Sequence, residues 1–159
     1  MIIVADASPL ISFAILNKLD VLDKLFKDIL IPIAVYKEIT KENKKHSDKL
    51  KSFAENKTKK VKNKLAVELL QKDLDLGESE AIVLAKENNI SDILMDEYKG
   101  RKIAKDNGLH PIGTLGVLIQ AKKKKLIKKV KPEINTLIEN HIRISDNLYS
   151  TALKLAGEE

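Results

Sequence analysis

The sequence contains no cysteine and no tryptophan, and aromatic residues make up only 4% of its 159 residues. Without cysteine, neither a disulfide framework nor a thiolate metal site can form. The small number of aromatic residues disfavours a protein that binds single-stranded nucleic acid by stacking bases on an aromatic platform. Candidate metal ligands and catalytic groups are therefore restricted to oxygen and nitrogen side chains.

Long hydrophobic runs are also missing, since no segment approaches the roughly 18 apolar residues that span a membrane. The chain begins Met-Ile-Ile-Val-Ala-Asp, without the basic stretch and apolar segment of a signal peptide. We therefore predict a cytoplasmic protein with no membrane association. A length of 159 residues with 43% hydrophobic residues predicts a single domain, residues 1–159, with a substantial core.

Arginine is scarce although the chain is basic, with a net charge of +6. Only Arg101 and Arg143 are arginines among the 29 basic residues, and the lysines are concentrated at 41–64 and 122–131. Lysine meets phosphate as a point charge, whereas arginine reads bases through paired hydrogen bonds. If nucleic acid is bound, we expect lysine contacts with its backbone that tolerate many sequences. Genome composition or a thermophile bias also produces lysine-rich surfaces, so both interpretations stay open.

Short apolar runs alternate along the chain with longer stretches of helical spacing. Four runs suit strands that are buried on both faces, at 2–5, 29–32, 90–95 and 109–112. This alternation predicts βαβ units, that is, an α/β fold with a parallel sheet covered by helices on both faces.

Helices are predicted from the apolar spacing between and after these runs. The first begins with Ser8 as N-cap and Pro9 in the first helical position. The others are expected at 20–27, 33–40, 65–74, 77–85, 100–106, 114–124, 132–141 and 145–156. The lysine-rich insert at 41–64 reads as a solvated helix pair or a mobile segment. The two C-terminal helices (132–159) suit dimer contacts and internal packing equally well.

Four carboxylates are expected at the carboxyl edge of the predicted sheet, where function collects in open α/β folds. Asp6 and Asp96 directly follow two of the strands. Glu38 comes one helical turn after another strand, and Glu80 lies near the start of a helix. Mg²⁺ and Mn²⁺ prefer such hard oxygen ligands, and a pair of these ions can activate water to attack a phosphodiester. The pattern therefore predicts a metal site for hydrolysis without a covalent nucleophile.

Each of these acids also has a purely structural interpretation. Asp6 and Ser8 are both suited to capping the first helix. Glu78 and Glu80 fall in the first turn of another helix, where negative charge interacts favourably with the helix dipole. The other two acids have equally ordinary explanations, as a surface helix residue and as a turn residue at a strand end.

Five segments of the chain resemble the motifs of the PIN-domain family, within about residues 2–125. They are Val4–Ile11, Ile31–Glu38, Leu76–Ala85, Leu94–Arg101 and Ile112–Leu118. The resemblance is to an uncharacterised prokaryotic PIN-like branch that is related to VapC-type toxins. It implies a three-layer fold with a short parallel sheet of four or five strands and helices on both faces. It also implies a metal-dependent ribonuclease that uses Mg²⁺ or Mn²⁺.

The resemblance assigns metal binding and catalysis to Asp6, Glu38, Glu80 and Asp96. The third acid of the family is commonly aspartate, whereas this sequence has Glu80 there, with Glu78 as a rival. The lysine-rich insert is longer than expected for a minimal toxin. The longer glutamate side chain makes the third acid the least secure member of the predicted site, and the insert is a separate departure from the family pattern.

Three further residues are predicted to support the site. Ser8 is suited to a hydrogen bond with Asp6 or with a metal-bound water, as well as to capping. Arg101 is suited to orienting a carboxylate or binding the scissile phosphate, and equally to a structural salt bridge. Thr114 has the position of an N-cap.

Partners follow from the same resemblance. RNA is the expected substrate, with its backbone contacted by lysine, and an antitoxin protein and a homodimer are further expectations. The alternative is a catalytically silent PIN-like module that binds RNA or protein.

Overall fold

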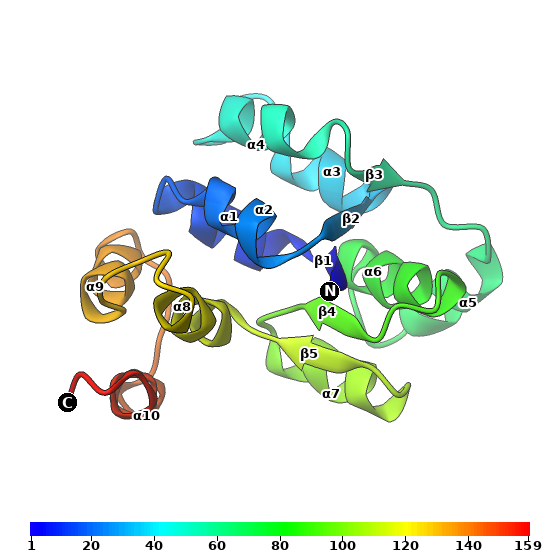
Figure 1. Cartoon of the computed structure of the whole chain (residues 1–159). Helices are drawn as coiled ribbons and strands as arrows, with labels where there is room; N and C mark the ends of the chain where they lie inside the picture. The colour runs from blue at the N-terminus through cyan, green and yellow to red at the C-terminus, as the bar shows by residue number, and fades with distance from the viewer.

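Five short parallel strands form the central sheet of the computed structural model, which describes residues 1–159 (Figure 1). Their order across the sheet is β3-β2-β1-β4-β5. The strands are β1 (Ile2–Ala5), β2 (Asp28–Pro32), β3 (Thr58–Lys59), β4 (Asp92–Leu94) and β5 (His110–Ile112). The central strand pairs Ile3 with Ile29 on one side and Val4 with Ile93 on the other. Because every pair is parallel, the carboxyl ends of all five strands lie at one edge.

Ten helices surround the sheet (Figure 1). They are α1 (Ala7–Ile15), α2 (Leu19–Leu25), α3 (Ile33–Ile39), α4 (Ser47–Ala54), α5 (Lys64–Leu70), α6 (Leu76–Glu87), α7 (Tyr98–Asp106), α8 (Thr114–Lys123), α9 (Lys131–Glu139) and α10 (Asp146–Ala156). None has the length and apolar character that crossing a bilayer requires.

Two hydrophobic cores lie on the two faces of the sheet. Successive strand residues point to opposite faces, and accordingly Ile3 and Ala5 belong to one core while Val4 belongs to the other. The larger core takes its helical side chains from α1–α4 and α8–α10, and the smaller core from α5–α7. Both faces of β1 are therefore buried, which explains its unbroken apolar sequence. The predicted three-layer α/β fold is confirmed.

The lysine-rich insert contains more structure than its composition suggests. Within residues 41–64 the chain forms α4 and the two-residue strand β3, and it ends at the start of α5. Leu50 and Phe53 anchor α4 in the larger core, while the lysines of this helix stay exposed. The insert therefore extends the sheet by one edge strand.

The start of α1 differs from the prediction. Asp6, in extended conformation, occupies the N-cap position, and the helix begins at Ala7. The backbone N–H of Asp6 donates to the carbonyl of Leu94, so the chain passes from sheet pairing into the helix without a spacer. Ser8 consequently lies in the first turn, and its prediction as N-cap is wrong. In the same way Gly113, and not Thr114, precedes α8.

A single carboxylate holds the end of the chain against the connection between α8 and α9. Glu158 accepts hydrogen bonds from the backbone N–H groups of Val130 (2.7 Å) and Lys131 (3.0 Å) and from Lys122 Nζ (2.9 Å). Burial raises the pKa of Glu158, but these hydrogen bonds and the charge of Lys122 outweigh it and lower the pKa to about 2. These hydrogen bonds hold the C-terminal end of α10 next to the connection between α8 and α9.

Candidate functional site

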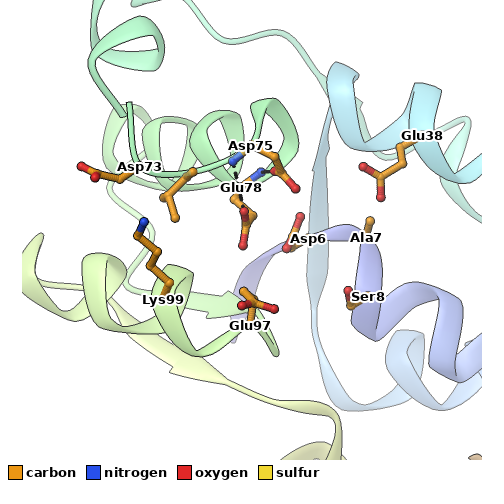
Figure 2. A pocket seen from close by; sticks show the side chains of 10 residues that line it. Asp6, Ala7, Ser8, Glu38, Asp73, Asp75, Glu78, Glu97 and Lys99 are labelled. Atoms are coloured by element: carbon orange, nitrogen blue, oxygen red, sulfur yellow. Dashed lines mark hydrogen bonds between the residues drawn. The ribbon is translucent and has the colours of Figure 1, made fainter. Parts of the chain in front are cut away.

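An acidic cavity of about 250 Å³ lies at the carboxyl end of β1 (Figure 2). Six of its ten lining residues are carboxylates and one is a lysine. The carboxylates come from the β1–α1 junction, α3, the loop before α6, α6 itself and the β4–α7 junction: Asp6, Glu38, Asp73, Asp75, Glu78 and Glu97. Lys99, Ala7, Ser8 and Leu74 complete the lining. Segments far apart in the sequence thus bring negative charge to one point.

Asp6 is the most buried of these carboxylates, with 6% of the residue exposed. Burial, as the largest cause, raises the pKa of Asp6 to about 7. The backbone N–H of Ala7 acts in the opposite direction, and the charges of Glu78, Asp75 and Glu38 raise the pKa further. Asp6 therefore holds a proton readily near neutral pH when nothing else neutralises it.

The start of α6 fixes two further acids in the cavity wall. Asp75 is the N-cap, and its Oδ1 accepts the N–H of Glu78 at 2.8 Å. Glu78 Oε1 accepts the N–H of Asp75 at 3.2 Å, which completes a capping box. Burial first, and then the neighbouring charge of Asp75, raise the pKa of Glu78, while its backbone hydrogen bond from Asp75 lowers it. This local motif holds Glu78 in position beside Asp6.

The structure separates the four predicted acids into two pairs. Asp6 and Glu38 both line the cavity, whereas Glu80 and Asp96 do not. Glu80 Oε1 accepts the backbone N–H of Ala34 at 3.0 Å. Glu78, the rival for the third position, is the residue of α6 that reaches the cavity. Ser8, a predicted supporting residue, is also in the lining.

Asp96 turns away from the cavity toward the start of α8. Its Oδ1 accepts the N–H of Thr114 at 2.7 Å, and its Oδ2 accepts the Thr114 hydroxyl at 2.6 Å. Arg101 donates from Nη1 to the carbonyl of Met95 at 3.0 Å. Gly113 leaves room for both side chains, because a Cβ there would lie 2.9 Å from Arg101 Nη1 and 3.0 Å from Asp96 Oδ1.

Four charged lining residues were not predicted, namely Asp73, Asp75, Glu97 and Lys99. Glu97 follows Asp96 directly, so the acidic pair at this strand end was visible, but not which member faces the cavity. Asp75 and Glu78 have the spacing of a capping box, which was a usable signal. Asp73 and Lys99 lie in a loop and in a first helical turn and carry no sequence signal of a site.

The chemistry of these side chains fits a divalent cation. None of the six lining carboxylates takes part in an ion pair. No three acidic or histidine side chains are already close enough together to form a metal-binding group. Mg²⁺, however, is usually held by one or two carboxylates, with water and substrate phosphate as its other ligands. Unpaired oxygen ligands around the buried Asp6 meet that requirement.

Comparison with known families gives one match. A sequence model described as PIN domain matches residues 2–158. The chain belongs to the PIN-domain family. The resemblance drawn from five short segments thus extends over almost the whole sequence. No curated protein and no solved structure gave a significant match.

PIN domains are typically nucleases, and they generally use divalent metals. In this PIN domain the carboxyl edge of the parallel sheet carries the acidic cavity, with Asp6 directly after the central strand. Family membership and cavity therefore point to the same general class of function, hydrolysis of nucleic acid.

Proposed function

We propose that this PIN domain is a Mg²⁺- or Mn²⁺-dependent endoribonuclease that hydrolyses RNA phosphodiesters with an activated water. The observation that carries the proposal is the cavity lined by six carboxylates, none of which has an ion-pair partner. A divalent cation supplies an activated water and stabilises negative charge on the phosphate and the leaving oxygen.

The roles of the lining residues follow from burial and position. Asp6, Glu38 and Glu78 are the proposed metal ligands, because they come from three elements that meet at the end of β1. Glu97, on the wall formed by the β4–α7 junction, can accept a hydrogen bond from the attacking water and orient it. Lys99 is the one cation of the lining, and its ammonium group would attract the substrate phosphate.

Two lysine-rich segments were candidates for binding the RNA backbone, and the structure favours residues 41–64. Helix α3 carries Glu38 and ends one residue later, and the exposed Lys41, Lys44 and Lys45 follow Glu38 within seven residues of the chain. The segment 122–131 instead begins at the C-terminal end of α8. Thr114, which contacts Asp96, lies at the opposite end of that helix. We therefore propose that RNA enters across the end of α3.

Cleavage of single-stranded RNA in millimolar Mn²⁺ tests the proposal. Asp6→Asn and Glu38→Gln are expected to reduce the rate by about 100-fold or more, because even the loss of an outer-shell partner of a metal ligand costs roughly 10- to 100-fold. Glu68→Gln, an exposed acid on α5 outside the cavity lining, is the matched control and should cleave like the wild type. Unchanged cleavage by Asp6→Asn would sink the site assignment.

Thermal unfolding with added Mn²⁺ distinguishes this enzyme from a catalytically silent module that binds RNA or protein. A ligand that binds only the folded state must raise its stability. We expect millimolar Mn²⁺ to raise the melting temperature of the wild type and to leave that of Asp6→Asn nearly unchanged. No stabilisation of the wild type would favour the silent module.

Membership of a toxin–antitoxin pair belongs to the same proposal. The antitoxin partner and the homodimer stay predictions. Light scattering of the purified protein tests the homodimer. Loss of RNA cleavage on adding the protein encoded beside this chain tests the antitoxin.

A further inference from the structure

Helix α3 lacks a capping residue of its own. It has only seven residues, and its N-cap position is Pro32, which makes no side-chain cap hydrogen bond. The first N–H groups of a helix have no partner inside the helix. Helices this short are marginal without outside support. A side chain that accepts hydrogen bonds from the first N–H groups of α3 therefore stabilises the whole helix, including the turn that carries Glu38.

Glu80 supplies the missing acceptor from α6. Its Oε1 accepts the N–H of Ala34, the second residue of α3, at 3.0 Å, although the two residues are 46 positions apart in the chain. A negative carboxylate at this end of a helix is also favourable for the helix dipole. The interaction is half-buried, so water competes for it only in part.

The same stretch of α6 also contacts the cavity. Gly77 packs closely enough that a Cβ there would lie 3.4 Å from Val35 Cγ2 of α3 and 3.6 Å from Asp6 Oδ1. One residue later, Glu78 lines the cavity, and Figure 2 shows Asp6 between Glu78 of α6 and Glu38 of α3. The start of α6 thus touches every element that brings one of the three proposed ligands.

We propose that Glu80 is a positioning residue: it fixes the start of α3 against α6 and thereby holds Glu38 at the cavity opposite Glu78. This inference rests on the proposed function in taking Glu38 as a site residue. It gives the two glutamates of α6 separate tasks, since Glu78 faces the cavity and Glu80 orders the helix that brings Glu38.

Two substitutions separate positioning from direct metal binding. Glu80→Gln keeps an oxygen that can accept the Ala34 N–H, whereas Glu80→Ala removes it. Glu87→Ala is the matched control. Glu87 is the last residue of α6 and likewise accepts backbone N–H groups from another segment, at Lys62 and Asn63, but it does not line the cavity.

Three measurements on the full chain are informative. Amide hydrogen exchange at Ala34 reports the hydrogen bond, and the carboxyl ¹³C signal of Glu38 in metal-free protein reports its surroundings. The Mn²⁺ concentration that gives half of the maximal thermal stabilisation reports the assembled site. None of the three needs RNA cleavage, so a failure of the proposed ribonuclease activity can be told apart from a failure of this inference.

Glu80→Ala should speed Ala34 exchange, shift the Glu38 signal and raise the Mn²⁺ midpoint roughly 10-fold, as loss of a supporting contact does. Glu80→Gln should resemble the wild type in all three. Glu87→Ala should lower the melting temperature and leave the Glu38 signal and the midpoint unchanged.

Several results would overturn the inference. If Glu80→Gln raised the midpoint as much as Glu80→Ala, the charge of Glu80 would matter directly, as for a ligand. If Glu80→Ala left the Glu38 signal unmoved, Glu80 would contribute to stability alone. Should Glu80→Ala fail to fold, Glu80→Asp replaces it, because its carboxylate is one methylene shorter. If Mn²⁺ does not stabilise the wild type, Ala34 exchange and the Glu38 carboxyl signal still test whether Glu80 positions α3.

Discussion

Replacing Asp6 by asparagine removes a buried carboxylate while keeping the size of the side chain. Because the pKa of Asp6 is about 7 in the folded protein and 3.8 as its ordinary value, the folded protein holds a proton that the unfolded chain has already lost between these two pH values. The stability of the metal-free protein therefore falls as the pH rises from about 4 to about 7, and then stays level. Asparagine has no such pH dependence.

The size of this effect follows from the same two pKa values. At about 1.4 kcal/mol for each unit of pH, the carboxylate costs up to about 4 kcal/mol above pH 7. The buried asparagine amide also needs hydrogen-bond partners, and any that are missing reduce the stability gained by removing the carboxylate. We expect a net stabilisation of roughly 1–3 kcal/mol at pH 8, or a rise in melting temperature of about 3–10 °C for a chain of this size.

The assay is thermal unfolding in EDTA at pH 5, 6, 7 and 8, for the wild type and Asp6→Asn. Asp73→Asn is the matched control, because it removes the same charge from an exposed position in the same cavity. The advantage of Asp6→Asn should grow with pH, while Asp73→Asn should show little change. If Asp6→Asn is less stable at pH 8, or its advantage is the same at every pH, the carboxylate is a structural cap and this reasoning is refuted.

Three other substitutions test the surroundings of the site. Glu158→Gln should destabilise the protein by roughly 1–2 kcal/mol at pH 7. Because the pKa of Glu158 is lowered from 4.5 to about 2, this loss should disappear as the pH falls through that range in urea titrations. Thr114→Val should cost roughly 1–2 kcal/mol in the same titrations, because Asp96 loses its hydroxyl donor. Gly113→Ala should lower the melting temperature, and adding Arg101→Ala should restore part of it, since the new Cβ would lie 2.9 Å from that guanidinium.

The sequence was sufficient to predict the parallel sheet, because strands that are buried on both faces need unbroken apolar runs such as residues 2–5. Residues 58–59 gave no such signal, since β3 is a two-residue edge strand that contains Lys59. Its pairing depends on backbone hydrogen bonds to β2, and these leave no mark on the side chains.

Choosing between neighbouring acids was beyond the sequence for a geometric reason. Glu78 and Glu80 share one helical turn, and which of them faces the cavity depends on how α6 is rotated against the sheet. Asp96 and Glu97 are adjacent at a strand end, and the backbone there directs the Asp96 side chain to Thr114 and the Glu97 side chain to the cavity. Asp6 was different, because it directly follows the central strand, which packs between both helical layers.

Every residue that lines the cavity lies between Asp6 and Lys99, so the last sixty residues contribute no side chain to it. Those residues include β5 and the three helices that complete the larger core. They are joined to the strand end beside the cavity by the pairing of β5 with β4, by the hydrogen bond from Arg101 to the Met95 carbonyl, and by the two hydrogen bonds between Asp96 and Thr114. The exposed surface of the C-terminal third can therefore be redesigned, or fused to another domain, without changing any residue that lines the acidic cavity, as long as these links are kept.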